Sequence, residues 1–392
     1  MSAIGIIAEF NPLHNGHKYI LDRATESGKT VICVISGNFV QRGETALVSK
    51  DVRTRMALKC GADIVVELPI LWSMSTAQNF ALGAVWQLYH SGCDEIIFGS
   101  ECGDIKRLEK LADLLLCDEF AAVVTEEIKK GVTFAVARQK AIKELGGEDK
   151  LLENPNDNLG IEYIIAAKKL NLDIKFSCVK RQGVGHDKGV FEGFASASYL
   201  REEIKKGNID SLSEYMPDSC FKILKNADIS DMALLERAIL SSLRLTKKDE
   251  FKNLPDLSEG LDNALFASAR QADSYGELCD LLKSKRYTLA RVRRLILSAY
   301  LKHDNQFFMA TPPYVRVLGF NHFGERHLKN LKSIIPVVMR VSEVLILDSD
   351  ARKVFDAECQ ATDIFALSLE NPQRCGGEYT FKLIKDDKDD KN

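Results

Sequence analysis

The chain of 392 residues is long enough for two domains and a sizeable hydrophobic core. Its 45% of hydrophobic and 28% of charged residues are typical of a soluble globular protein, and its net charge of −3 excludes nucleic-acid binding through overall positive charge. The ten cysteines include no C-x-x-C pair, so we expect free thiols in a cytoplasmic protein and no structural zinc site. The apolar run at the N-terminus is too short for a signal peptide or a membrane span, and we expect no membrane partner.

The first stretch of the chain predicts a phosphate-binding turn. Residues 4–7 are an apolar run typical of a buried strand, residues 11–12 (Asn-Pro) interrupt it, and a helix is predicted to begin near residues 15–16 (Asn-Gly). A helix start offers unpaired N–H groups and the positive end of the helix dipole, and both favour anions. We therefore predict that a triphosphate lies over the start of this helix and that His14 and His17 reach its oxygens.

Strands and helices alternate in the first half of the chain. Further buried strands are predicted at residues 30–35, 64–68, 95–98 and 174–179, and amphipathic helices at 50–59 and 76–89. This order predicts an α/β fold, a doubly wound parallel sheet with its ligand crevice at the carboxyl ends of the strands. The polar loop at 36–43 lies at such an end, where loops usually carry function. Between the last two strands, a helical insertion is predicted at about 104–170, with helices at 108–116, 126–144 and 160–169.

The alternation stops after Gly207. Helices are predicted at 232–245, 260–272, 277–282 and 289–301, and two strand-like segments follow at 315–320 and 335–339. We therefore predict an α/β catalytic domain at 1–207 and a mainly helical second domain at 208–384. The last residues, 385–392, carry mixed charge without apolar side chains and are predicted to be disordered.

Residues 14–17 read His-Asn-Gly-His and have the form HxGH, which resembles the motif of the nucleotidyltransferase superfamily that includes the class I aminoacyl-tRNA synthetases. Two alternatives are a helix-capping turn with exposed histidines and a metal site, although no carboxylate or cysteine nearby completes a metal site. Nucleotidyl transfer fits these residue types, because charge grows on the phosphoryl oxygens of ATP and imidazoles and N–H groups stabilise it. A carboxylate substrate is already ionised, so the reaction requires no protein nucleophile and no strong general base.

Residues 196–201 (Ser-Ala-Ser-Tyr-Leu-Arg) resemble the second motif of that superfamily, a hydroxyl-rich turn that contacts the ATP phosphates from the opposite side. Ser196 or Ser198 would suit the N-cap of the helix that follows, and an ordinary capped helix is the alternative. Arg181 comes just after a predicted strand, where its guanidinium could bind phosphate, although a surface arginine would have the same spacing.

Five segments together resemble the bacterial tRNA(Met) cytidine acetate ligase family. They are Ala-Glu-Phe-Asn-Pro-Leu-His-Asn-Gly-His at 8–17, Ser-Gly-Asn-Phe-Val-Gln-Arg-Gly-Glu at 36–44, Gly-Ala-Asp-Ile-Val-Val-Glu-Leu-Pro at 61–69, Phe-Gly-Ser-Glu at 98–101 and Asn-Asp-Asn-Leu-Gly-Ile-Glu-Tyr at 156–163. The resemblance implies a nucleotidyltransferase fold of HUP/Rossmann-like type. It also implies an enzyme that activates acetate with ATP as acetyl-adenylate and acetylates the exocyclic amino group of the wobble cytidine in elongator tRNA(Met).

The resemblance also implies site residues. His14 and His17 would be catalytic, and the ATP site would use Ile7, Ala8, Glu9, Phe10, Asn11, Pro12, Leu13, His14, Asn15, Gly16, His17, Lys18, Tyr19, Ile20, Gly99, Asn156 and Arg181. The hydroxyls of Ser196 and Ser198 would join them. Mg²⁺ is expected to accompany ATP, although the sequence contains no dedicated protein cage for it.

A local concentration of arginines suggests where tRNA binds. Arg286, Arg291, Arg293 and Arg294 lie in and before the predicted helix at 289–301, and phosphate contacts from such residues give salt-dependent affinity. A solvated helix face is the alternative. Two other functions also remain open: adenylylation of a cofactor precursor by another enzyme of the superfamily, and ATP sensing by a non-enzymatic RNA-binding protein.

Overall fold

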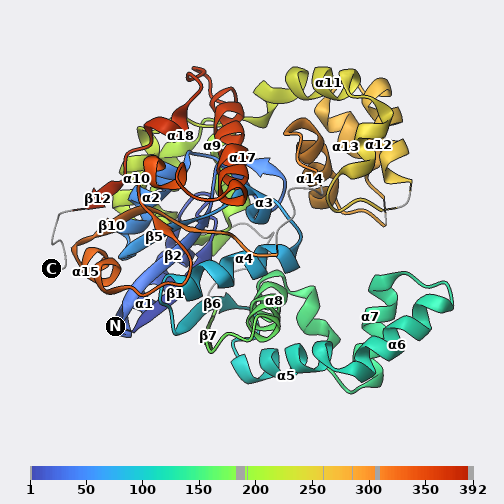
Figure 1. Ribbon diagram of the computed structural model, residues 1–392, viewed down its shortest axis with the longest axis horizontal. Coiled ribbons are helices and arrows are strands. Elements are labelled where there is room, and N and C mark those ends of the chain that lie inside the picture. Colours follow the sequence, from blue (N-terminus) through green and yellow to red (C-terminus); the bar gives the residue numbers. More distant parts are fainter. Residues whose placement is uncertain are drawn as a thin grey trace.

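The structure is a computed structural model that describes residues 2–181, 190–191, 193–258, 260–284, 286–304 and 310–386. An eight-stranded sheet lies at its centre, with the order β11-β10-β5-β2-β1-β6-β7 and with β12 paired to β10 (Figure 1). Its strands are β1 (Ala3–Ala8), β2 (Thr30–Ser36), β5 (Ile64–Leu68), β6 (Glu95–Ser100), β7 (Lys175–Lys180), β10 (Val315–Asn321), β11 (Val337–Val338) and β12 (Ile384–Asp386). Two hairpins lie outside it: β3 (Phe39–Val40) with β4 (Glu44–Thr45), and β8 (Val190–Phe191) with β9 (Phe194–Ala195).

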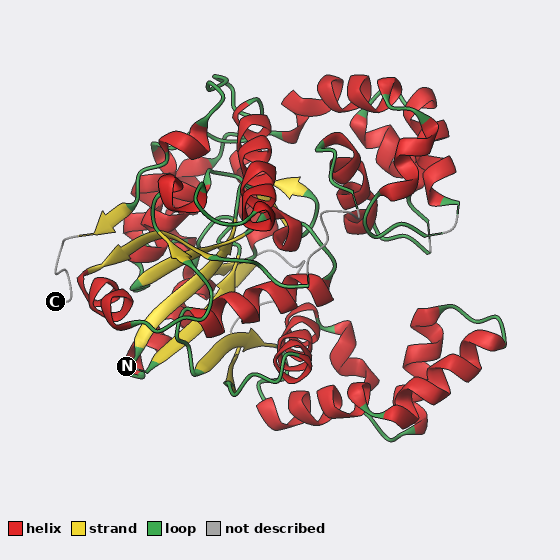
Figure 2. Cartoon of the chain, viewed as in Figure 1, coloured by secondary structure: helices red, strands yellow, loops and turns green. Residues whose placement is uncertain are grey.

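Helices surround this sheet and also project from it (Figure 2). The α-helices are α1 (Asn15–Glu26), α2 (Lys50–Lys59), α3 (Ile70–Ser73), α4 (Ala77–His90), α5 (Ile105–Leu116), α6 (Asp118–Lys129), α7 (Phe134–Glu144), α8 (Pro155–Lys169), α9 (Ala197–Lys205), α10 (Asp218–Lys225), α11 (Glu236–Leu245), α12 (Leu261–Gln271), α13 (Tyr275–Leu282), α14 (Leu289–Tyr300), α15 (His322–Asn330), α16 (Val341–Val344), α17 (Ser349–Ala366) and α18 (Gly377–Thr380). Short 3₁₀ segments are η1 (Asp149–Glu153), η2 (Ile209–Tyr215), η3 (Met232–Leu235) and η4 (Lys248–Asn253).

Both faces of the sheet are buried, which explains why its central strands are continuous apolar runs. In β2, Ile32 and Val34 belong to a core shared with α4 and α8, whereas Cys33 and Ile35 belong to a second core shared with α1, α2 and α10. The strands β5, β2, β1, β6 and β7 all run parallel. The predicted α/β fold with a doubly wound parallel sheet is therefore confirmed, and these strands lie where the sequence predicted them.

The sheet does not follow the predicted division at residue 207. After the helices η3 to α14, which we call the helical module (residues 232–300), the chain returns to the sheet: β10 pairs antiparallel with β5, and β11 and β12 pair with β10. Arg316 of β10 stands opposite Glu67 of β5, and their side chains form a buried ion pair of 2.9 Å. The apolar pattern at 315–320 predicts a strand, but it does not specify the partner strand, which this tertiary ion pair helps to fix.

Two further differences concern local breaks. The predicted helix at 126–144 is interrupted, because Gly131 has a φ of +86° and ends α6, so that α6 and α7 form a hairpin. The tail at 385–392 was predicted to be disordered, but its first two residues, 385 and 386, belong to β12. Residues 387–392 lie outside the described part. The α6–α7 hairpin and the helical module project on the same side of the sheet in Figure 1.

All ten cysteines carry free thiols. Within the described ranges, no helix is both long enough and apolar enough to cross a membrane.

Candidate active site

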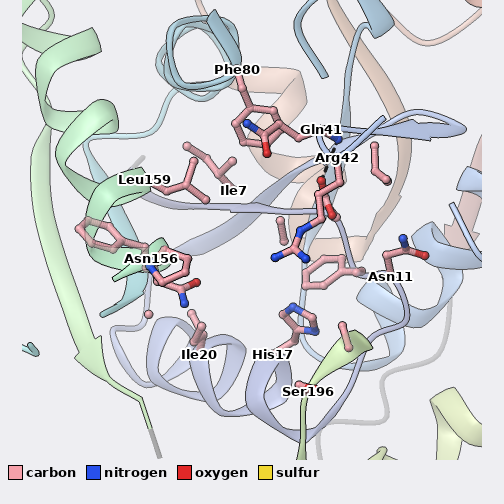
Figure 3. A pocket seen from close by; sticks show the side chains of 18 of the residues that line it. Ile7, Asn11, His17, Ile20, Gln41, Arg42, Phe80, Asn156, Leu159 and Ser196 are labelled. Carbon is pink, nitrogen blue, oxygen red and sulfur yellow. Dashed lines mark hydrogen bonds between the residues drawn. The ribbon is translucent and has the colours of Figure 1, made fainter. Parts of the chain in front are cut away.

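The order of the strands changes direction between β1 and β6. From β1 the chain passes to β2 and β5 on one side, and it then crosses to β6 and β7 on the other side. A doubly wound sheet opens a crevice at the carboxyl ends of its strands at such a switch point. A cavity of about 350 Å³ occupies this crevice (Figure 3), and we call it the switch-point pocket.

The turn after β1 forms the floor of this pocket and begins α1. The side chain of His14 is the N-cap: its Nδ1 accepts the N–H of Gly16 at 3.0 Å, and Nδ1 of His17 accepts the N–H of His14 at 3.4 Å. This reciprocal pair is a capping box built from two histidines. Just before the turn, Phe10 has a φ of +48°, a left-handed conformation that is uncommon for an aromatic residue, and its buried side chain packs edge-on against His17.

These hydrogen bonds determine which ring nitrogen carries the proton. Because Nδ1 of each histidine accepts a backbone N–H, the neutral ring is protonated at Nε2, which makes Nε2–H a donor. The two rings stack with centroids 3.9 Å apart. Burial, followed by the charge of Arg181, lowers the pKa of His17 to about 3, so this ring is neutral at physiological pH. His17 therefore presents a neutral hydrogen-bond donor and no general base.

A buried arginine holds the ends of β1 and β2 together beside the pocket. The guanidinium of Arg53 is fully buried and donates to the carbonyl oxygens of Glu9 at 2.9 Å, Ser36 at 2.8 Å and Val48 at 3.1 Å, and also to that of Gly37. Burial lowers the pKa of Arg53 to about 10, so it remains charged. These carbonyls belong to irregular backbone at strand ends, where sheet bonds are no longer available.

The turn before α9 forms a second wall. The hydroxyl of Ser196 is the N-cap and accepts the N–H of Tyr199 at 3.2 Å, and the Ser198 hydroxyl lies 3.0 Å from it. Arg201, one turn later, donates to the carbonyl oxygen of Asn11 at 2.8 Å and ties this wall to the floor. The start of α9 thus lies beside the start of α1 (Figure 3), and both present hydroxyl or N–H donors.

The third wall comes from β6, β7 and α8. Gly99 is the penultimate residue of β6, and a Cβ there would come within 3.2 Å of Cδ1 of Ile20, so glycine keeps this edge of the pocket open. Asn156 donates to Oε1 of Glu101 at 2.5 Å, and Nε of Arg181 lies 3.9 Å from the same oxygen. The carboxylate of Glu101 therefore positions both side chains at this end.

The β3–β4 hairpin closes the pocket from above. Its tip residues Gln41 and Arg42 line the cavity, and Figure 3 shows the Arg42 side chain reaching from the hairpin into the pocket toward His17. The N–H of Gln41 donates to Oε1 of Glu9 at 2.9 Å, which fixes the tip to the end of β1. Among the side chains that line the pocket, Arg42, Arg181 and Arg201 surround it with positive charge, so its chemistry favours an anion.

Comparisons with known proteins agree with this geometry. Residues 1–378 match the family model described as HIGH Nucleotidyl Transferase. A tRNA(Met) cytidine acetate ligase of Caldanaerobacter subterraneus subsp. tengcongensis is 39% identical over 95% of this chain and 96% of that protein. The chain belongs to the tRNA(Met) cytidine acetate ligase family. Another family member, from Thermoanaerobacter sp. (strain X514), is 38% identical over 98% of this chain and 100% of its own length.

Solved structures of the family share the fold over the whole chain. The crystal structure of Thermotoga maritima TmcAL bound with alpha-thio ATP superposes with a TM-score of 0.89 at 31% identity, covering 98% of this chain and 100% of that one. Its apo form superposes with a TM-score of 0.91. The resemblance stated from the sequence motifs is therefore confirmed at the level of family and fold.

The structure brings most of the predicted nucleotide residues together. The switch-point pocket is lined by Ile7, Ala8, Glu9, Phe10, Asn11, His14, His17, Ile20, Gly99, Asn156, Arg181, Ser196 and Ser198, and a smaller adjoining cavity by Gly16 and Tyr19. Four predicted residues lie elsewhere. Leu13 is buried in the core, Asn15 donates to the carbonyl oxygens of Gly193 and Glu214, Lys18 pairs with Asp22, and Pro12 lines neither cavity. These side chains support the turn from outside the pocket.

The arginines predicted to bind tRNA are placed differently from one another. Arg286 is exposed. The other three make intramolecular contacts: Arg291 donates to the carbonyl of Asp256 at 2.8 Å, Arg293 pairs with Glu44 of the hairpin, and Arg294 contacts both Asp256 and the carbonyl of Gln41 at 3.2 Å. Arg293 and Arg294 therefore join the helical module to the hairpin that closes the pocket. Among these four, only Arg286 has an exposed side chain; it lies before the start of α14, with its guanidinium 5.7 Å from the centroid of the Tyr287 ring.

Several pocket residues were not singled out from the sequence. The loop at 36–43 was recognised as a functional position, but Gln41 and Arg42 within it were not named. Phe80 and Leu159 also line the pocket, and each has the helical spacing of an ordinary core residue. Only their position on α4 and α8 at the strand ends distinguishes them.

Among the residues that the structure describes, none of the carboxylates grouped closely enough to hold a cation lines the pocket. In the part of the chain that the structure describes, the carboxylates close enough to share a cation are those of Glu67, Glu358 and Glu378. Lys50 and Arg316 already form buried ion pairs with this group. These carboxylates join β5, α17 and α18, so their role is structural and no step of the chemistry is assigned to them.

Proposed function

We propose that this chain is an ATP-dependent tRNA(Met) cytidine acetate ligase. The observation that carries the proposal is near-complete coverage of curated ligases at 38–39% identity, in a chain whose HxGH turn lies at a switch-point pocket. The substrates are ATP, acetate and elongator tRNA(Met), and the product is N4-acetylcytidine at the wobble position.

The reaction consists of two group transfers. An oxygen of acetate attacks the α-phosphorus of ATP, a new P–O bond forms, and the bond to the β-phosphate breaks, so that pyrophosphate leaves and acetyl-adenylate remains. The exocyclic amine of cytidine then attacks the acetyl carbon, the bond from that carbon to the phosphate oxygen breaks, and AMP leaves with loss of one proton from nitrogen. Neither transfer requires a protein nucleophile.

The geometry supports a role for each wall in the first transfer. The Nε2–H groups of His14 and His17, together with the helix start at Gly16, would stabilise the charge that grows on the α-phosphoryl oxygens and on the leaving pyrophosphate. Ser196 and Ser198 would bind the phosphates from the neighbouring turn before α9. The nucleoside end would be held by Gly99, Asn156, Arg181 and Ile20. Mg²⁺ would enter bound to the ATP phosphates and would keep several water ligands.

tRNA would approach over the side on which the helical module and the α6–α7 hairpin project (Figure 1). The exposed Arg286 is our candidate for a phosphate contact. The wobble cytidine would have to leave its stack to enter the pocket, as single-stranded bases do in sequence-specific RNA recognition.

ATP–pyrophosphate exchange, measured with and without acetate and followed by acetyl transfer to tRNA(Met), tests this function. We expect exchange that depends on acetate and transfer that depends on an unmodified wobble cytidine. Exchange that ignores acetate would instead indicate another adenylyltransferase of the superfamily. Absence of exchange with any substrate would indicate a non-enzymatic ATP sensor.

A further inference from the structure

The switch-point pocket has an end that the nucleotide chemistry does not use. In Figure 3, Asn156 and Ile20 lie at one end and His17 and Ser196 along the floor, whereas Phe80, Gln41 and Arg42 lie at the top. Attack in line with the bond that breaks places acetate opposite the leaving pyrophosphate. If the nucleoside lies between the first two residues and the β- and γ-phosphates lie over the floor, the top faces the side of the α-phosphate away from the leaving pyrophosphate. An attacking substrate would have to occupy this upper end.

The upper end combines one cation with apolar walls. Ile7 and Phe80 contribute aliphatic and aromatic surface, and Ala77 lies three residues before Phe80 on the same face of α4. Val40 precedes the hairpin tip. The carboxylates nearby are engaged: Glu9 accepts the N–H of Gln41, and Glu44 pairs with Arg293. Arg42 lines the pocket beside these groups, and its side chain reaches from the hairpin tip toward His17 (Figure 3).

The hairpin that carries Arg42 is fixed on both sides. The N–H of Gln41 donates to the Glu9 carboxylate, at the end of β1, at 2.9 Å. The carbonyl oxygen of Gln41 accepts from Arg294 of the helical module at 3.2 Å. Gly43 follows Arg42 and has a φ of +74°. It packs so closely on α14 that a Cβ would lie 2.6 Å from the backbone nitrogen of Arg294. The backbone beneath Arg42 is thus held in place although its side chain is exposed.

We propose that this upper end is the acetate subsite, with Arg42 binding the carboxylate and Phe80 and Ala77 enclosing the methyl group. The proposal rests on the proposed ligase function. Acetate offers only two features for recognition, a carboxylate that a guanidinium binds well and a methyl group that needs an apolar wall. The guanidinium would also offset the repulsion between acetate and the α-phosphate as one carboxylate oxygen approaches phosphorus.

The same arrangement predicts selection by chain length. Phe80 is only 4% exposed and closes the apolar wall, so an acyl chain longer than acetate would collide with its ring. A hydrophobic wall of this kind discriminates one methylene by roughly 10- to 200-fold. Phe80 would therefore be a specificity-determining residue, and Arg42 a catalytic residue that touches the substrate.

The first experiment separates binding of acetate from binding of ATP. ATP–pyrophosphate exchange gives the KM for acetate, and calorimetry without acetate gives the Kd for ATP. We expect Arg42→Ala to raise the KM for acetate by at least tenfold while the Kd for ATP changes less than twofold, and Arg42→Lys to fall between it and wild type. Arg326→Ala, an exposed arginine on α15, is the matched control and should change neither value. An equal loss of ATP affinity in Arg42→Ala would show that Arg42 binds phosphate and would overturn the proposal.

The second experiment tests the apolar wall with acetate, propionate and butyrate in the same exchange assay. Phe80→Ala should raise the ratio of propionate to acetate turnover at least tenfold. Because Phe80 also belongs to a buried core, Ala77→Val provides a variant at a half-buried position, and it should raise the KM for acetate without changing the Kd for ATP. Unchanged acyl preference and unchanged acetate KM in both variants would place acetate elsewhere. Exchange by wild type that ignores acetate would instead overturn the proposed function itself.

Discussion

The hydrogen bonds of His17 predict that its two ring nitrogens have separate roles. Nδ1 accepts the N–H of His14 in the capping box, and in the proposed reaction Nε2–H would donate to the α-phosphoryl oxygen. His17→Asn can retain an acceptor near Nδ1 but has no group at Nε2. His17→Gln can place an amide N–H near Nε2 but loses the acceptor of the cap. The two substitutions therefore divide the functions of one side chain.

The expected magnitudes differ between the two variants. Loss of one preorganised donor at a developing oxyanion costs about 2.7–4 kcal/mol, or roughly 10²–10³ in rate. Loss of a capping interaction costs about 1 kcal/mol of folding free energy. His17→Asn should thus slow acetate-dependent adenylate formation about 100-fold with nearly wild-type stability, and His17→Gln should be faster than His17→Asn but less stable by about 1 kcal/mol. His17→Ala should show both losses.

Single-turnover formation of acetyl-adenylate and urea unfolding measure these two quantities on the same preparations. Affinity for tRNA, measured separately, should stay near wild type in all three variants, because His17 lies on the floor of the pocket. Our assignment of the Nε2–H donor would be refuted if His17→Gln were as slow as His17→Asn. A parallel fall in tRNA affinity would point to misfolding.

Five further outcomes are expected. Because the pKa of His17 is lowered to about 3 from 6.5, adenylate formation should show no inflection from this group between about pH 6 and 9. The unfolded chain binds a proton at His17 below about pH 6.5 and the folded chain does not, so wild type should lose more stability than His17→Asn between pH 7.5 and 5 in urea unfolding. Arg53→Met leaves four carbonyl oxygens without their donor, at about 1–3 kcal/mol for each that stays buried and unpaired, and should lower the free energy of unfolding by several kcal/mol, measured by the same method. The single changes Glu44→Arg and Arg293→Glu should each lower acetate-dependent exchange, and the double variant should recover part of it; no recovery would show that the ion pair between the hairpin and the helical module does not support the pocket. Arg286→Ala should weaken tRNA binding and reduce the slope of log affinity against log salt by about 1, and an unchanged slope would remove Arg286 from the interface.

Arg293 and Arg294 were predicted to bind tRNA, but in the structure they connect the helical module to the β3–β4 hairpin. Arg293 and Arg294 hold the hairpin that carries Gln41 and Arg42, so the module contacts the rim of the catalytic pocket directly. A movement of α14 would therefore shift the pocket's upper end. This coupling explains why a chain that acetylates tRNA would need the module close to its chemistry.

The sequence by itself determined the local elements and the phosphate-binding turn. Strand-length apolar runs, the Asn-Pro break and the HxGH spacing are local features, and local features fix a strand, a turn and a helix start without reference to distant residues. The set of motifs determined the family. The resemblance also grouped Gly99, Asn156 and Ser196 at one site, and the structure places them around one pocket.

Only the tertiary structure decided which distant segments meet. The return of β10 to the sheet depends on its pairing with β5, and the closure of the pocket depends on contacts of Arg293 and Arg294 with a hairpin about 250 residues earlier. Basic residues in a helix have the same pattern whether they face RNA or a neighbouring carboxylate. Phe80 likewise has the spacing of a core residue and becomes a pocket wall only because α4 begins at the ends of the strands. Long-range burial and charge pairing, which no local pattern contains, decide these roles.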